Sequence, residues 1–481
     1  MEQTPLLAGQ YASTLDKRHP VWIVLRELLW LIGSSGPTVV AYFLQVSLQI
    51  APIVCLGHLG TTELAAYALG SMFAGVTGWS LAVGIVTAMD VNKEEFEDED
   101  LTYLGVQLQK TLMSLAGLFI PVSFVWWHAT SLLTFLGQSD EITHLAGLYI
   151  RYLLIGAPAY FCFEALKKFC QTQGIVSVPT KVLMVVSPIN AILNYVLIFQ
   201  RDLGLIGASV AISITYWLLF ISMVLFIVFV QGKEAWGGWS RQAFSDCSTF
   251  FIHAFVGIFM VCSEWWAFEI LTLAASYIGV VDLASQSIMM TIASTTFILP
   301  FGISVSGANR IDHWLECADT RYAKYAANSA VLLSIFFGAG MSVFYKLAAP
   351  RLAALFTSQS DLAEVLVAVL PLVGLCQMFE SISTVASGIL RGMNRPQIST
   401  YLTLSTYYCL IFPLSFILAF GFDFGIQGLW IGMIVGFAIN ASIQLLYLCT
   451  TVDWQHEVDL ANGVGDIEAE EDPSTGKVQE D

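Results

Sequence analysis

Apolar residues in this sequence gather into long runs separated by short polar stretches. Each run is about 20 residues or longer, the length that a helix needs to cross the hydrocarbon core of a bilayer. Six runs fall in each half of the chain. They cover residues 29–57, 65–89, 104–127, 142–166, 180–200, 204–230, 249–276, 283–307, 325–349, 362–388, 398–421 and 425–450. The pattern predicts an all-α integral membrane protein with twelve transmembrane helices in two six-helix bundles.

The second half of the chain repeats features of the first half. The pattern Gly-x-x-acid-Leu-Ala begins at Gly60 and returns at Gly279, which is 219 positions later. One acid and two glycines also recur with identical internal spacing. Asp202, Gly204 and Gly207 return as Asp423, Gly425 and Gly428. An internal repeat of this length in a membrane protein is typical of a transporter whose two lobes enclose a central cleft.

The runs and their connectors divide the chain into five segments. We expect a cytoplasmic N-terminal segment (1–28), an N-lobe (29–230), a cytoplasmic linker (231–248), a C-lobe (249–450) and an acidic disordered tail (451–481). With the N-terminus placed in the cytoplasm, 16 of the 20 lysines and arginines lie on the cytoplasmic side. This excess follows the positive-inside rule and predicts that both termini are cytoplasmic.

Composition supports a membrane protein and restricts its partners. Hydrophobic residues make up 56% of the chain and charged residues 12%, against about 25% charged residues in soluble domains. The net charge of −17 belongs mainly to one acidic loop (94–100) and the tail, so nothing indicates a nucleic-acid partner. The nine cysteines show neither a disulfide framework nor metal-ligand spacing. We expect no cofactor, no metal and a monomer in the lipid bilayer.

Three acids inside apolar runs are the main candidates for function, because an intramembrane acid is costly. Glu264 and Glu269 lie in the seventh run and Glu380 in the tenth. From the helical rise, Glu264 lies about 20 Å and Glu380 about 16 Å from the inner ends of their helices, so the two can meet in one lobe. Glu269 is about 140° around the helix from Glu264 and is predicted to face elsewhere. A desolvated carboxyl group can exchange a proton for an organic cation, which is the simplest antiport mechanism.

Aromatic and amide side chains give weaker signals. The aromatic residues near these acids offer π-faces to a bulky cation, although they are equally suited to packing or to the membrane interface. They are Trp265, Trp266, Phe268, Phe379, Tyr407 and Tyr408, of which Trp265 and Tyr408 are our candidates. Asn190 and Asn194 are one helical turn apart. They either line the N-lobe or join helices by hydrogen bonds.

Several stretches are specific in combination. They are Gly60 to Ala65, Gln173 to Pro179, Asn190 to Tyr195, Trp236 to Ser240, Glu264 to Glu269, Pro300 to Arg310, Gly388 to Gly392 and Gly428 to Gly432. In them the chain resembles the multidrug and toxic compound extrusion (MATE) family in its eukaryotic form, over residues 27–450. The resemblance implies a secondary active antiporter, not an enzyme, that exports organic cations, xenobiotics or secondary metabolites in exchange for H⁺. It also implies that the coupling acids fall on Glu264 and Glu380.

Four features depart from the family pattern or lie outside it. The stretch after Asp90 is altered, and so is the stretch at 312–318, where relatives carry glycines. Thr291 occupies a position where some relatives have a glutamate. The N-terminus contains Glu2, Leu6 and Leu7 in the arrangement of an acidic dileucine sorting signal, which favours a vacuolar or endosomal membrane over the plasma membrane.

Three other functions stay open at this level. A lipid-linked substrate flippase of the same broad superfamily would need a basic central groove, whereas the runs hold acids and few arginines. A membrane-embedded enzyme would need a cluster of His or Asp deep in the runs, and the histidines lie near run ends or in loops. A transport-impaired relative or scaffold is compatible with the two altered stretches.

Overall fold

The computed structural model describes residues 20–89, 102–173, 175, 177–230, 232–245 and 247–461. Within these ranges the chain is almost entirely helical and contains no strand. The sorting signal at Glu2, Leu6 and Leu7, the acidic loop that follows Asp90, and residues 462–481 of the tail lie outside the described residues.

Each half of the chain supplies helices that run back and forth across the molecule. In the first half these are α2 (Pro20–Leu59), α3 (Thr61–Ala74), α4 (Ser80–Thr87), α5 (Thr102–Trp127), α6 (Ala129–Phe135), α7 (Asp140–Leu153), α8 (Ala157–Thr172), α9 (Ser177–Tyr195) and α10 (Gly204–Phe229). In the second half they are α11 (Cys247–Ile278), α12 (Val280–Glu316), α13 (Thr320–Phe356), α14 (Ser360–Gly392), α15 (Pro396–Ser405), α16 (Phe412–Phe416), α17 (Gly425–Thr450) and α18 (Trp454–Ala461).

Short π-helical segments join some of these helices into continuous spans. The segment η1 (Gly75–Trp79) joins α3 to α4, η3 (Val196–Gln200) extends α9, and η6 (Thr406–Ile411) and η7 (Ile417–Gly421) flank α16. Eleven helices in the described ranges are then long and apolar enough to cross a membrane. The pair α7 and α8, bent by 57°, makes the twelfth span.

The bend between α7 and α8 has a local cause. Pro158 stands in the first turn of α8 and cannot donate the backbone hydrogen bond that would continue α7. Gly156 lies directly against α10, where a Cβ atom would be 2.7 Å from the Cα of Ser213. The bent span therefore stays close to its neighbour at the bend.

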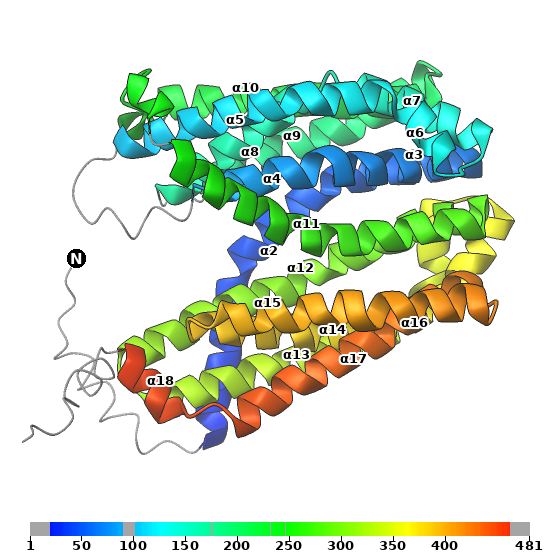
Figure 1. Ribbon diagram of the computed structural model, residues 1–481. Coiled ribbons are helices and arrows are strands. Elements are labelled where there is room, and N and C mark those ends of the chain that lie inside the picture. Colours follow the sequence, from blue (N-terminus) through cyan, green and yellow to red (C-terminus); the bar gives the residue numbers. More distant parts are fainter. Residues whose placement is uncertain are drawn as a thin grey trace, which may run out of the picture.

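The helices form two bundles that are connected by two crossing helices (Figure 1). Helices α3 to α10 form one bundle and α12 to α17 the other, as the repeat predicted. The first helix of each half crosses between them: α2 packs on α9 and on α12 and α13, and α11 packs on α4 and on α12 and α17. The two halves of the chain meet near residue 240. Each crossing helix belongs to one half in sequence, but it packs on both bundles.

The repeated glycines have the same backbone role in both halves. Asp202 and Asp423 have φ angles of 55° and 56°, and Gly204 and Gly425 have φ angles of 53° and 54°. These left-handed turns precede α10 and α17, and no side chain caps either helix. The acids therefore mark a turn rather than a helix cap.

The described helices extend beyond the apolar runs. The run at 283–307 lies within α12, which begins after Gly279 and ends only at Glu316. Charged residues end an apolar run without ending a helix, because a helix continues past the hydrocarbon until a turn stops it. The altered stretch at 312–318 is accordingly helical up to Glu316, and the turn comes at Ala318 with a φ angle of 55°.

A buried ion pair attaches the first half of α2 to α12. Nε and Nη2 of Arg310 each donate to one carboxylate oxygen of Glu27, both at 2.8 Å. The guanidinium carbon lies 4.5 Å from the ring centre of Trp30 and 4.7 Å from that of Trp314. Both charged side chains are nearly excluded from solvent. The charged form of each residue is therefore stabilised mainly by the other.

Breaking this pair should destabilise the protein. We expect Arg310→Met to cost about 3 kcal/mol or more, because it leaves the Glu27 carboxylate buried without a partner. The double variant Glu27→Leu with Arg310→Met should recover part of this loss. Melting temperatures of the purified protein in detergent measure both effects. The two residues would not be coupled if the double variant lost as much stability as the single variants Glu27→Leu and Arg310→Met lose together.

Candidate functional site

A cavity of about 610 Å³ lies between the two bundles. Its walls come from both bundles and from the crossing helices α2 and α11. The charged residues that line it are Glu264, Glu269, Glu380 and Arg391. Three acids and one base therefore surround a space that is enclosed by apolar helices.

The cavity reaches one end of the molecule and is closed at the other. We call the end where α2 begins the proximal end and the end where it finishes the distal end. The lining residues continue to Arg391 and Pro396 at the proximal end. At the distal end the bundles touch: Thr61 Oγ1 donates to Gln359 Oε1, and the Tyr277 hydroxyl donates to the Leu136 carbonyl. The molecule is thus open on its proximal side.

Glu264 and Glu269 both line the cavity, which differs from the prediction that they face different surroundings. The cavity extends around α11, because this helix stands between the bundles instead of within one. The Glu264 side chain is exposed to the cavity and Glu269 is half-buried. Within the described part of the chain, neither carboxylate accepts a hydrogen bond, and neither has a basic partner within 4.0 Å.

The Glu269 side chain faces the first bundle. Its Oε1 lies against Gly75 of η1, where a Cβ atom would be 2.7 Å from it. A residue with a side chain at position 75 would displace the carboxylate. The glycine therefore allows the acid of α11 to approach the first bundle closely, and spacing within α11 alone gives no signal of this contact.

Glu380 is the most buried of the three acids and belongs to a polar network in the second bundle. Its Oε2 accepts from Gln377 Nε2 at 2.5 Å, and Gln377 Oε1 accepts from Thr296 at 3.3 Å. Thr296 in turn lies 2.5 Å from the Tyr345 hydroxyl. The network joins α12, α13 and α14 around the carboxylate. Gln377, three residues before Glu380, shares its helix face, a signal that sequence reasoning did not use.

The two tyrosines after Thr406 lie in different places. Tyr407 is buried, lines the cavity, and is within electrostatic reach of Glu264 and Glu380. Tyr408 is half-exposed, does not contribute to the described cavity wall, and donates to the Ser263 carbonyl at 2.9 Å. Tyr407, and not the candidate Tyr408, is therefore the tyrosine of this pair that lines the described cavity. Trp265, the other aromatic candidate, does line the cavity.

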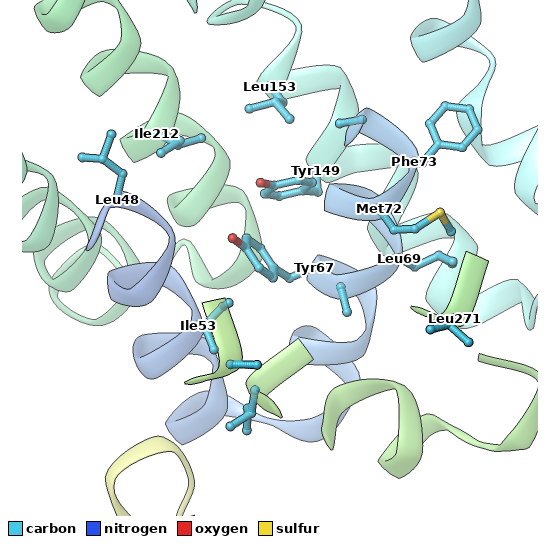
Figure 2. Packing of buried hydrophobic residues seen from close by; sticks show 14 of the residues in the cluster. Leu48, Ile53, Tyr67, Leu69, Met72, Phe73, Tyr149, Leu153, Ile212 and Leu271 are labelled. Carbon is cyan, nitrogen blue, oxygen red and sulfur yellow. The ribbon is translucent and has the colours of Figure 1, made fainter. Parts of the chain in front are cut away.

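The part of the cavity wall that the first bundle supplies is aromatic, which the sequence did not indicate. Tyr67 and Tyr149 lie side by side with their hydroxyl groups on the same side (Figure 2), and their ring centres are 5.3 Å apart. Trp79 and Tyr216 meet edge to face at 5.7 Å. All four line the cavity. They come from α3, η1, α7 and α10, which are too far apart in sequence to form a recognisable motif.

Asn190 and Asn194 are fully buried and are absent from the described cavity wall. Asn190 Nδ2 donates to the Leu48 carbonyl at 3.1 Å, and its Oδ1 accepts from Thr215 at 3.0 Å and from Asn194 at 3.1 Å. The arrangement corresponds to the hydrogen-bonding alternative, since Asn190 connects α2, α9 and α10.

Ser80 joins α11 to the first bundle. Its hydroxyl, fully buried, accepts from Trp266 Nε1 at 3.2 Å and from Cys262 Sγ at 3.5 Å. Further along, Gly84 lies against the backbone of Ile258, where a Cβ atom would be 2.4 Å from its Cα. The proximal half of α11 is therefore attached to α4, and no feature of the sequence around Ser80 indicates this role.

The site offers no arrangement for a metal. Among the described residues, no group of three His, Cys, Asp or Glu side chains is close enough to hold an ion. What the cavity can do chemically is to bind a cation, or a proton, at carboxylates and to pack an aromatic body against rings.

Comparisons with known proteins identify the family. The MatE family model matches residues 37–196 and 257–417, one match in each half. An uncharacterized transporter of Schizosaccharomyces pombe is 35% identical over 464 residues, covering 96% of this chain and 86% of that protein. Multidrug and toxin extrusion protein 2 of Mus musculus is 29% identical, covering 91% of this chain and 77% of the relative.

The fold is shared with solved structures. The eukaryotic MATE transporter AtDTX14 superposes with a TM-score of 0.73 at 25% identity, over 92% of this chain and 99% of that one. An inward-facing MATE family transporter gives a TM-score of 0.75 at 17% identity, over 87% of this chain and 96% of the other. Two matched halves, the relatives and the shared fold agree, and the chain belongs to the MATE family of multidrug and toxin extrusion transporters, as a multi-pass membrane protein and not an enzyme.

Proposed function

We propose that this transporter exports organic cations, including xenobiotics or secondary metabolites, in exchange for H⁺. The observation that carries the proposal is the cavity between the bundles, in which Glu264 and Glu269 lack a basic partner among the described residues and Glu380 accepts only from an amide. A flippase for a pyrophosphate-linked lipid would need the opposite charge, and Arg391 is the one basic residue in the described wall.

The exchange follows from the energy of an unpaired carboxylate in a low-dielectric cavity. Its ionised form is penalised unless a counter-charge is nearby, whereas the protonated form is neutral and costs much less. A bound organic cation and a bound proton therefore relieve the same penalty and compete for it. Binding one releases the other, and a proton gradient drives export of the cation.

Aromatic rings supply the second half of the substrate site in this proposal. Tyr407 and Trp265 line the cavity together with the acids, and Tyr67, Trp79 and Tyr149 line it from the first bundle. Planar cationic compounds gain from such rings by packing and by cation–π attraction. The combination favours monovalent aromatic cations over small inorganic ions such as Na⁺, for which the described part of the cavity wall shows no set of oxygen ligands.

Alternating access uses the contacts at the distal end. With the proximal side open, the pairs Thr61–Gln359 and Tyr277–Leu136 hold the distal side closed. These contacts must separate for the cavity to open on the other side. The proximal side, where α2 begins, is assigned to the cytoplasm, because the order of the spans along the sequence puts 16 of the 20 basic residues on the cytoplasmic side when the N-terminus lies there. Both termini are then cytoplasmic, the protein acts as a monomer, and the dileucine signal favours a vacuolar or endosomal membrane over the plasma membrane.

Removing the charge of the coupling acids should stop the exchange. We expect Glu264→Gln and Glu380→Gln to reduce uptake of a fluorescent organic cation into acid-loaded proteoliposomes at least tenfold, because neither variant can exchange a proton at that position. Glu364→Gln serves as the control, since Glu364 lies on α14 but outside the cavity wall. Unchanged uptake by Glu264→Gln would remove this residue from the mechanism.

The two neighbouring tyrosines should behave differently. Tyr407→Leu is expected to weaken binding of an aromatic cation several-fold, because it removes a ring beside both acids, within the range of cation–π energies. Tyr408→Leu should leave affinity nearly unchanged, since its hydroxyl bonds to the Ser263 carbonyl away from the cavity. Fluorescence anisotropy with purified protein measures both. Equal losses in the two variants would contradict the placement of the ring at the substrate.

Locking the distal end should abolish transport. In a background without the nine native cysteines, the pair Thr61→Cys and Gln359→Cys is expected to react with a short bifunctional thiol reagent. Uptake should then stop and should return after reduction. The single variants treated in the same way are the controls. Full uptake by the cross-linked protein would show that the distal contacts need not separate.

A further inference from the structure

One face of α14 carries opposite charges at two depths of the cavity. Its lining residues are Gln377, Glu380, Ser383, Thr384, Ser387 and Arg391. The steps of three and four residues between them place most of them in one stripe along the helix. Glu380 and Arg391 are separated by 11 residues, or about 16 Å of helical rise. A molecule in the cavity therefore meets a deep acid and, nearer the proximal mouth, a base.

Arg391 is held in place by close packing of α14 on α12. Its Nη2 donates to Ser304 Oγ at 2.9 Å, and this fully buried hydroxyl donates to the Thr384 carbonyl at 2.8 Å. At Gly388 a Cβ atom would lie 2.3 Å from Ser304 Oγ, and at Gly392 one would lie 2.5 Å from the Ala308 carbonyl oxygen. The two glycines bring the helices into backbone contact and so fix the base of the arginine side chain.

The guanidinium of Arg391 has no acidic partner among the described residues. Nearby arginines do have acidic partners, since Arg310 pairs with Glu27 and Arg395 pairs with Glu457, each at 2.8 Å. Arg391 is exposed to the cavity and uses one of its five N–H donors, on Ser304. An arginine that served only as a positive-inside signal would need neither a position in the cavity wall nor the hydrogen bond to Ser304.

We propose that Arg391 forms an anion-binding subsite at the proximal mouth, which selects zwitterionic substrates over their purely cationic counterparts. This subsite rests on the proposed function of the same cavity, because the cationic group is held by Glu264 and Glu380. Guanidinium groups bind carboxylates through two parallel hydrogen bonds. The hydroxyl groups of Ser399 and Thr403 line the same part of the cavity and offer further donors. A cation without an anionic group is repelled by the unpaired guanidinium.

The test uses two dyes that differ by one methyl ester. Rhodamine 110 carries a free carboxylate and is a zwitterion at neutral pH, whereas rhodamine 123 is its methyl ester and a cation. We expect the purified full-length protein to bind rhodamine 110 more tightly in fluorescence anisotropy. Arg391→Gln should lower this preference on the order of tenfold, the range of one charge-assisted contact. Arg391→Lys should keep part of it, and Arg395→Gln, whose arginine pairs with Glu457, should keep all of it.

Several outcomes would overturn the subsite. They are a wild-type protein that does not prefer rhodamine 110 or binds neither dye, and a preference that Arg391→Gln leaves unchanged. If Arg391→Gln does not fold, Ser304→Ala carries the test, since loss of the anchor should reduce the preference several-fold and an unchanged preference counts against the subsite. Proton-driven uptake is measured separately. Its absence, with the binding preference intact, would refute the exchange and not the subsite.

Discussion

The structure depends on the cost of leaving a carboxylate without a counter-charge inside the membrane. Glu264 and Glu269 line the cavity without a basic partner among the described residues. By contrast, Glu27 of α2 is fully paired with Arg310 of α12. A protein that can pair an acid so completely in one place has left others open where the two bundles meet. Arg391 is the one basic residue in the described cavity wall, and in the proposed exchange a proton or a substrate cation relieves the remaining cost. The arrangement of the bundles then responds to which of the two occupies the cavity.

The crossing helices connect this occupancy to the arrangement of the bundles. Helix α11 carries Glu264 and Glu269, is attached to the first bundle through Ser80, and ends at the distal contact made by Tyr277. A change in charge at either acid therefore acts on a helix that belongs to both bundles. Helix α2 has the same position in the first half, anchored to α12 by Arg310. The internal repeat thus provides two equivalent connectors, of which one bears the acids.

Much of the fold follows from the sequence, because membrane insertion depends on local apolarity that can be read one segment at a time. The twelve spans were predicted in this way, the two bundles from the internal repeat, and the family from the resemblance of specific stretches. Glu264 and Glu380 were selected because charge is rare in such segments. The contacts between segments could not be read. Helical spacing separates Glu264 from Glu269, yet both line the cavity because α11 stands between the bundles. Tyr407 and Tyr408 are adjacent, and only the path of the helix decides which ring faces inward. Ser80 and Gly75 act through partners nearly 190 residues away.

The central claim is that a proton and an organic cation compete for the same carboxylates. Proton release on cation binding tests it most directly, measured with a pH indicator in weakly buffered detergent solution over a series of starting pH values. The account predicts that the wild-type protein releases protons as the cation binds, and that the triple variant Glu264→Gln, Glu269→Gln and Glu380→Gln releases none. Saturating binding to the wild-type protein with no change in pH at any starting value would contradict it.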